Sequence, residues 1–213
     1  MVVEDGLKDP LVDRSSIYQI GGQPGHRPEE LVFVLKSVVA LYLSRGKMLV
    51  IQCYDVSKFF DKEMIEDAIL VCQKRGADPK AVRLWFKLNN KTKIKVKLQC
   101  GVSDVADVGA VVGQGTIGGA IVSQAVLDDG VMEHFEPGDD LQVKYGSVPM
   151  APFMFQDDLL NVVEGLPQAK IANDKVNTLM KQRGLALNKD KSVCVVVGSK
   201  RQRAKTHDEL ERG

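Results

Sequence analysis

Two adjacent carboxylates interrupt a stretch of the chain that is otherwise apolar. The stretch is PFMFQDDLLNVV, residues 152–163, in which Asp157 and Asp158 separate two runs typical of strands. Neighbouring like charges repel, and a carboxylate beside a dry core is costly unless a positive group compensates it. The pattern predicts a β-hairpin with strands over 153–155 and 159–163. The acid pair is then either the solvated tip of that hairpin or part of a Mg²⁺ site, because paired carboxylates are common Mg²⁺ ligands.

A third carboxylate ends another apolar run. Residues 47–56, KMLVIQCYDV, stay apolar until Asp55, as a buried strand would. Asp61 follows six residues later and is predicted to be the N-cap of a helix, whereas Asp55 has no such structural role. An acid at a strand end is what two-metal nucleotidyl transfer requires, since the metal ions must stabilise both the attacking and the leaving oxygen.

The remaining pattern predicts an irregular alternation of helices and strands. Residues 1–28 look irregular because they are rich in Gly, Pro and charge. Helices are predicted over 29–45, 61–75 and 166–183, a Gly-rich turn followed by a helix over 109–128, and a frayed helix in the charged tail 199–213. A second hairpin is predicted over 84–98, turning at Asn89-Asn90. This order favours an α+β fold with a mainly antiparallel sheet over a doubly wound parallel one.

The composition excludes several classes of protein. The net charge is +1, so any basic surface for nucleic acid has to be local. The four cysteines are scattered without Cys-x-x-Cys spacing, which disfavours disulfides and zinc and indicates a reducing compartment. No signal peptide is visible, and the longest apolar stretch, LVFVLKSVVALYL, is interrupted by Lys36. We therefore expect an intracellular protein, cytoplasmic or nuclear, with no membrane partner.

A glycine-rich segment offers a competing interpretation. In VVGQGTIGGA, Gly113, Gly115 and Gly118 have the G-x-G-x-x-G spacing of a dinucleotide-binding turn. No second buried strand ending in an acid follows at the required distance, and no βαβ rhythm surrounds the motif. The Rossmann-type alternative is therefore the weaker one.

Lysines occupy two places where phosphate could be bound. Lys93, Lys95 and Lys97 alternate with apolar residues, which predicts a strand with one lysine face. That face is either a solvated edge or a contact to a nucleic-acid backbone. Lys191 lies on a predicted turn between two strands, where it is either solvated or within reach of a phosphate.

Taken in order, these segments resemble the motifs of reverse transcriptases. YDVSKFFD resembles the first palm motif, VVGQGTIGGAIVSQAVL the second, FQDDLL the aromatic-x-Asp-Asp hairpin, and GLALNKDKS a later Gly-Leu…Asn…Lys-Ser element. Upstream, YQIGGQPGHRPEELVFVL resembles the fingers segment of group II intron and non-long-terminal-repeat retroelement (retrotransposon) enzymes. The resemblance covers residues 17–198, and four motifs in the right order are specific.

The resemblance assigns the chemistry to the acids described above. It implies that Asp55, Asp157 and Asp158 bind two Mg²⁺ ions, for which Mn²⁺ is a possible substitute, with the Val56 carbonyl as a further ligand. It also implies that Lys191 protonates the pyrophosphate leaving group.

The same resemblance assigns a nucleotide pocket. Phe60 matches the aromatic residue beneath the incoming sugar, Gln114 and Gly115 match the turn that contacts the nucleotide, and Arg27 is a candidate for gripping the triphosphate. Alternation at a strand end predicts that Phe59 points inward and Phe60 toward the site; the alternative is that both pack in the core.

The implied protein is an RNA-directed DNA polymerase domain. It would be a palm with an antiparallel sheet flanked by helices over 47–198, a partial fingers segment over 1–46, a charged tail over 199–213 and no thumb. Its partners would be an RNA template, a DNA primer and deoxynucleoside triphosphates. The alternatives are a non-catalytic nucleic-acid-binding remnant and an RNA-dependent RNA polymerase, although the acid hairpin reads FQDD and not the Gly-Asp-Asp expected of the latter.

Overall fold

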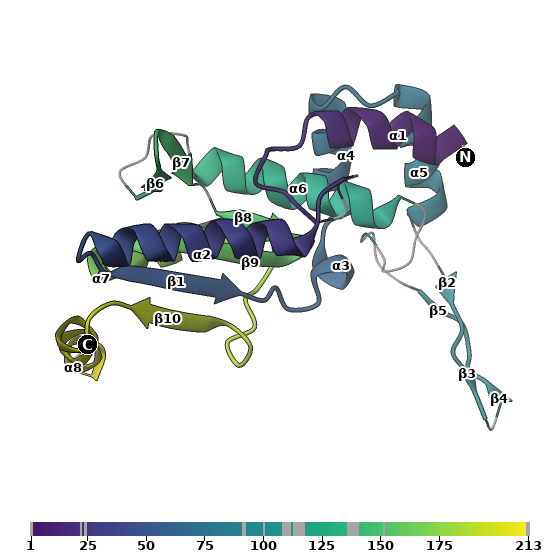
Figure 1. Ribbon diagram of the computed structural model, residues 1–213. Coiled ribbons are helices and arrows are strands. Elements are labelled where there is room, and N and C mark those ends of the chain that lie inside the picture. The colour runs from purple at the N-terminus through teal and green to yellow at the C-terminus, as the bar shows by residue number, and fades with distance from the viewer. Residues whose placement is uncertain are drawn as a thin grey trace. The chain divides into compact units, whose positions relative to one another are not determined.

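The chain forms two compact units in a computed structural model (Figure 1). The structure describes residues 2–21, 23, 25–90, 93–99, 101–107, 112, 118–135, 141–150 and 152–211. Unit 1 comprises residues 1–15, 58–129 and 183–185, and unit 2 comprises residues 16–57, 130–182 and 186–213. Within the described ranges, no helix has the length and apolar character needed to cross a membrane.

Unit 2 is built on a four-stranded antiparallel sheet. The strand order across the sheet is β10 (Val193–Val197), β1 (Leu49–Tyr54), β9 (Asp158–Glu164) and β8 (Phe153–Phe155). The unit also contains helices α2 (Pro28–Ser44), α7 (Leu166–Gln182) and α8 (Lys200–Glu211), and a small hairpin of β6 (Val143–Tyr145) and β7 (Val148–Met150). The predicted α+β fold with helices around an antiparallel sheet is confirmed, and this sheet does not have the parallel order that the dinucleotide-binding alternative requires.

Different helices cover the two faces of this sheet. Gln52 of β1 and Asn161 of β9 stand opposite each other, and the Gln52 amide donates to the Ala169 carbonyl of α7 at 3.0 Å. The α7 helix therefore covers this face. Alternate residues of a strand point to the other face, where Leu31 of α2 lines a pocket together with Cys53.

The buried pair of amides also sets the strand register. The Asn161 Nδ2 donates to the Gln52 Oε1 at 3.1 Å, and both side chains are buried. A slip of one residue between β1 and β9 would turn every side chain of one strand to the opposite face. It would also leave both amides buried without a partner, which costs about 1–3 kcal/mol for each group.

Unit 1 is mainly helical. Its elements are α1 (Val2–Asp13), α3 (Phe59–Lys62), α4 (Ile65–Lys74), α5 (Pro79–Asn89) and the short strands β2 (Lys93–Ile94), β3 (Lys97–Leu98), β4 (Gly101–Val102) and β5 (Ala106–Asp107). Helix α6 (Gly119–His134) begins in unit 1 and ends in unit 2. The core of unit 1 is apolar and includes Leu7, Leu11, Ile65, Cys72, Trp85, Val112 and Val122.

Helix α1 corrects the prediction that the N-terminal segment is irregular. Val3, Leu7 and Leu11 recur every four residues and are buried, so they form one apolar stripe. The helix was not predicted because Gly6 lies within it and glycine disfavours helices. The role of Gly6 is close packing, since a Cβ on Gly6 would lie 2.6 Å from the Cβ of Ala81 on α5.

The hairpin predicted over 84–98 is wrong in its first half, which belongs to helix α5. The helix begins after Asp78, whose side chain accepts a hydrogen bond from the Lys80 amide at 3.0 Å, and it continues to Asn89. Trp85 is fully buried on its inner face. The Asp-Pro start and the apolar spacing of three to four residues were the signals for this helix.

The predicted N-cap role of Asp61 is also wrong. Asp61 lies inside the short helix α3, and Met64 holds the N-cap position of the next helix. Phe59 is 2% exposed, so the prediction that it points inward is confirmed. Phe60 belongs to α3, but its side chain lies outside the part of the chain that the structure describes. The strand-alternation argument for its direction does not apply, because both residues are helical.

Candidate active site

The paired carboxylates lie on the hairpin between β8 and β9, as predicted. Phe155 and Asp158 form the last pair of the ladder, and Gln156 and Asp157 make the two-residue turn. Gln156 has a φ of 59°, a left-handed conformation that costs a non-glycine residue about 1–2 kcal/mol. The surrounding structure therefore has to hold this turn.

A segment distant in sequence packs against the turn. The Met154 amide donates to the Tyr18 carbonyl at 2.8 Å, and the Met154 carbonyl accepts from the Ile20 amide at 2.9 Å. Gly21 follows directly, and a Cβ at this position would overlap the backbone nitrogen of Gln156. Sequence reasoning missed this role of Gly21, for which the paired glycines of YQIGGQPG were the available signal.

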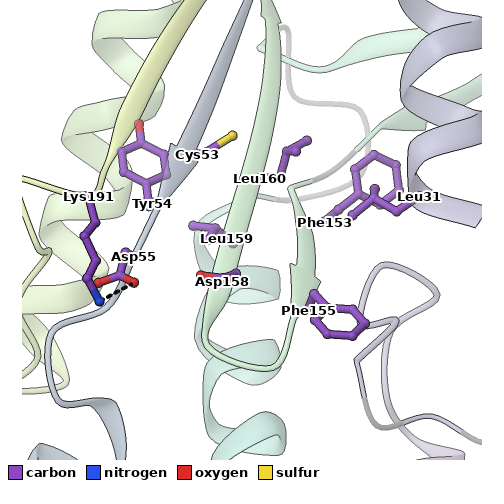
Figure 2. Close-up of a pocket in the computed structure, with 10 residues that line it drawn as sticks. All are labelled: Leu31, Cys53, Tyr54, Asp55, Phe153, Phe155, Asp158, Leu159, Leu160 and Lys191. Atoms are coloured by element: carbon purple, nitrogen blue, oxygen red, sulfur yellow. Dashed lines mark ion pairs between the residues drawn. The ribbon is translucent and has the colours of Figure 1, made fainter. Parts of the chain in front are cut away.

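Asp55 lies between an acid and a lysine. Asp55 comes directly after β1, whose last pair with β9 is Tyr54 opposite Leu159. The next pair in that register is Asp55 with Asp158, and on the other side the loop before β10 places the Lys191 Nζ 3.8 Å from an Asp55 oxygen. Directly opposed residues of antiparallel strands have Cβ atoms about 4.5–5.5 Å apart. Figure 2 shows these three side chains at the same end of the sheet.

A tight loop holds the lysine beside Asp55. The Asp55 amide donates to the Ser192 Oγ at 3.2 Å, and the Asp55 carbonyl accepts from the Asn188 amide at 2.8 Å. The Ser192 amide in turn donates to the Asn188 carbonyl at 2.9 Å. The Lys191 Nζ lies 3.8 Å from an Asp55 oxygen and is 69% exposed, so the ion pair is loose and the ammonium stays accessible.

The backbone around Val56 is held by hydrogen bonds of its two neighbours. Val56 and Leu187 form an isolated antiparallel bridge. Its hydrogen bonds run from the Asn188 amide to the Asp55 carbonyl and from the Ser57 amide to the Ala186 carbonyl, at 2.8 Å each. The Val56 carbonyl takes part in neither bond, so it fits the predicted role of an additional oxygen ligand.

A pocket of about 340 Å³ opens beside these groups (Figure 2). Asp55, Asp158 and Lys191 provide its charged groups. The rest of the lining is mainly apolar and comprises Leu31, Cys53, Tyr54, Phe153, Phe155, Leu159 and Leu160. The pocket therefore combines a charged end with an apolar wall, which suits a ligand that has both phosphates and an aromatic ring system.

The electrostatics of the pocket favour a bound cation. Partial burial raises the pKa of Asp158 above its usual value, the charges of Asp157 and Asp55 raise it further, and Lys191 partly offsets them. Burial, with a smaller effect of Asp158, also raises the pKa of Cys53, so its thiol stays protonated and is no nucleophile. Added positive charge would relieve the repulsion among the carboxylates.

The carboxylates of the pocket suit Mg²⁺ when substrate phosphates provide further ligands. Within the described ranges, no group of three or more His, Cys, Asp or Glu side chains lies close enough to form a protein-only metal site. Asp55 and Asp158 line the pocket, whereas Asp157 lies on the turn. Mg²⁺ at nucleotide sites is typically held by one or two carboxylates together with substrate phosphates. The residues present therefore suit an ion that arrives with a triphosphate.

The structure does not bring all predicted site residues together. Arg27 is exposed directly before helix α2, one turn ahead of the pocket residue Leu31. Phe60 belongs to unit 1, and Gln114 and Gly115 lie outside the described residues. The gathered set thus comprises Asp55, Asp158 and Lys191, all within unit 2, with Asp157 on the adjoining turn.

Comparison of the structure with solved structures identifies the fold. Telomerase from Candida albicans, solved with a fragment of telomeric RNA, aligns with a TM-score of 0.65 at 14% identity over 91% of this chain. Apo telomerase from Candida tropicalis aligns with a TM-score of 0.65 at 12% identity over 91% of this chain. The chain has a reverse-transcriptase-like polymerase fold.

The extent of this likeness is limited. The chain spans about a third of the length of both telomerases, 33% and 36% respectively. No family model and no curated protein matches the sequence. At these identities the likeness concerns the fold, so activity and partners are matters for proposal.

Proposed function

We propose that this chain is the catalytic region of an RNA-directed DNA polymerase, which adds deoxynucleotides to a DNA primer on an RNA template. The observation that supports this most directly is the position of Asp55, opposite Asp158 in the β1–β9 register and 3.8 Å from the Lys191 ammonium, in a reverse-transcriptase-like fold. The proposal treats residues 1–46 as partial fingers and 47–198 as the palm. Its origin in a retroelement rests on the sequence resemblance.

The acids are proposed to bind the metal ions that accompany the triphosphate. Asp55, Asp157, Asp158 and the Val56 carbonyl would hold two Mg²⁺ ions, or Mn²⁺ in their place. When bound, these ions supply charge neutralisation at the attacking and leaving oxygens. The protein's own contribution is orientation, because the buried register and the strained turn hold the carboxylates before the substrate arrives.

Lys191 is proposed to act on the leaving group. Its ammonium is exposed beside Asp55, and the loop that carries it is anchored to the Asp55 backbone by two hydrogen bonds. A cation at this place can stabilise the charge that develops on pyrophosphate, and its proton can pass to the departing oxygen. Asp55 would keep the Nζ near the reacting phosphates.

The remaining assignments concern nucleotide selection. Phe60 is proposed to exclude a 2′-hydroxyl, Gln114 and Gly115 to contact the incoming nucleotide, and Arg27 to bind its phosphates. The support for Phe60, Gln114 and Gly115 is the sequence resemblance. For Arg27 there is a positional argument as well, since it precedes by one helical turn a residue that lines the pocket.

Primer extension tests the proposed function. The chain is incubated with a labelled DNA primer on an RNA template, deoxynucleotides and Mg²⁺, beside Asp55→Asn, Asp158→Asn and the control Asp174→Asn, which removes an exposed carboxylate from helix α7. We expect extension by the parent and the control, and a loss of about 100-fold or more in each site variant, since several kcal/mol of charge stabilisation disappear.

Two results would reject the proposal. Extension by both site variants at the parental rate would show that the two carboxylates are not needed for nucleotide addition. Binding of the primer–template without any extension by the parent would favour the non-catalytic nucleic-acid-binding alternative. Circular dichroism melting of each variant checks that the fold is kept.

A further inference from the structure

The strands β2 to β5 of unit 1 form one two-stranded ribbon (Figure 1). Lys93 pairs with Asp107 and Ile94 with Ala106, whereas further along Lys97 pairs with Val102. The two registers differ by one residue, so the ribbon contains a bulge between them. Beside the bulge, the Val96 amide and carbonyl both bond to Ser103, at 2.9 Å each.

The ribbon carries large apolar side chains that are exposed. Every side chain between residues 93 and 106 whose exposure the structure describes is exposed. Val96, Val102 and Val105 are 49%, 62% and 50% exposed. An isolated two-stranded hairpin is marginally stable in water, so the exposed valines favour a partner that the ribbon contacts.

The charges on the ribbon indicate the chemistry of that partner. Lys93 stands opposite Asp107 in the strand register. Lys97 stands opposite Val102, and Lys95 lies at the bulge. Among the described residues, neither Lys95 nor Lys97 forms an ion pair, and both are exposed. Two adjacent lysines of the row therefore remain uncompensated.

We propose that Lys95 and Lys97 bind the phosphate backbone of a nucleic-acid duplex, independently of its sequence. The two residues lie two positions apart on the same arm of the ribbon, and their exposed ammonium groups can contact successive phosphates of a duplex backbone. Lysines reaching phosphates from such a ribbon position the duplex without reading bases. The inference rests on the proposed function, for which it names a contact to the primer–template.

The salt dependence of binding tests this contact. Fluorescence anisotropy of a fluorescein-labelled RNA–DNA duplex is measured over a range of KCl concentrations, in EDTA and without nucleotides. The variant is Lys95→Gln/Lys97→Gln. The matched control is Lys80→Gln/Lys87→Gln, which removes two exposed lysines from helix α5 of the same unit.

We expect the ribbon variant to lower the slope of log K against log [KCl] by about 1.4–1.8, from about 0.7–0.9 for each lost phosphate contact. A fourfold rise in salt would then weaken the parent about tenfold more than the variant. The control should keep the parental slope. The proposal would be overturned if the parent and the ribbon variant had the same slope, or if the control lost as much slope as the ribbon variant. Either result would favour a protein as the partner of the exposed valines.

The outcome is separable from that of the polymerase proposal. A chain that binds the duplex through the ribbon yet extends no primer contradicts the catalytic proposal alone. A chain that extends the primer while the ribbon variant keeps the parental slope contradicts the ribbon proposal alone. Absence of any duplex binding by the parent overturns the ribbon proposal directly.

Discussion

Glu63 should make unit 1 less stable as the pH rises. Its side chain is 1% exposed, and neither carboxyl oxygen has a hydrogen-bond partner among the residues that the structure describes. Burial, as the largest effect, raises the pKa of Glu63 to about 8 from an ordinary value of 4.5. Ser123 and Arg183 lower this pKa somewhat, although the Ser123 hydroxyl forms no hydrogen bond of acceptable geometry with the carboxyl.

The sign of the effect follows from proton binding. Between pH 4.5 and pH 8 the folded state keeps the Glu63 proton, while the unfolded state has released it. Raising the pH in this window therefore favours unfolding, by about 1.4 kcal/mol for each pH unit. Over the whole window the loss reaches at most about 5 kcal/mol, a large part of the 5–15 kcal/mol that typically stabilises a domain.

Urea unfolding at several pH values measures this loss. Trp85 is the only tryptophan and is fully buried in the core of unit 1, so its fluorescence reports on this unit. Glu63→Gln cannot ionise, and its unfolding free energy should fall much less between pH 5 and pH 8 than that of the parent. The control Glu66→Gln removes an exposed carboxylate from the neighbouring helix and should keep the parental slope. Equal slopes in the parent and Glu63→Gln would refute the reasoning.

Three further variants test the site. Gly21→Ala should lower primer extension at least about tenfold with little change in melting temperature, because its methyl group displaces the Gln156 amide; parental activity would contradict this contact. Lys191→Met should raise the pKa of Asp158 in a carboxyl NMR titration, since it removes the charge that lowers it, and an unchanged or lower value would contradict the arrangement. Phe60→Val should raise the ratio of ribonucleotide to deoxynucleotide kcat/KM; a fixed ratio with both activities reduced would make Phe60 a core residue.

The parts of the fold that the sequence predicts are those with a clear local pattern. The apolar run that ends at Asp55 and the acid pair between two apolar runs both became strands of one antiparallel sheet. Their relative register was not predictable, because it depends on the buried contact between Gln52 and Asn161, residues that are distant in sequence. The role of Gly21 was not predictable either, because the turn residue that it contacts, Gln156, is also distant in sequence.

The two helices that were not predicted had misleading local sequence patterns. Helix α5 was read as a strand because Leu84–Leu88 is rich in aromatic and apolar residues, while its true signal, the Asp78 cap, lies before that stretch. In α1, glycine and proline obscured a regular apolar stripe. Tertiary packing decided both cases, since Trp85 and Leu7 are fully buried in the same core.

The interleaving of the two units has a consequence for the synthesis of the chain. Strand β1 lies at the centre of the sheet, yet its two neighbours begin only at residues 158 and 193. At about 5–20 residues per second, a ribosome needs about 5–20 s to reach the first of them. During that delay the run LVIQCY has no strand partner, so its unpaired edges are open to other nascent chains. Slow translation between residues 55 and 158 should therefore increase aggregation, and a chaperone that binds extended apolar segments should reduce it.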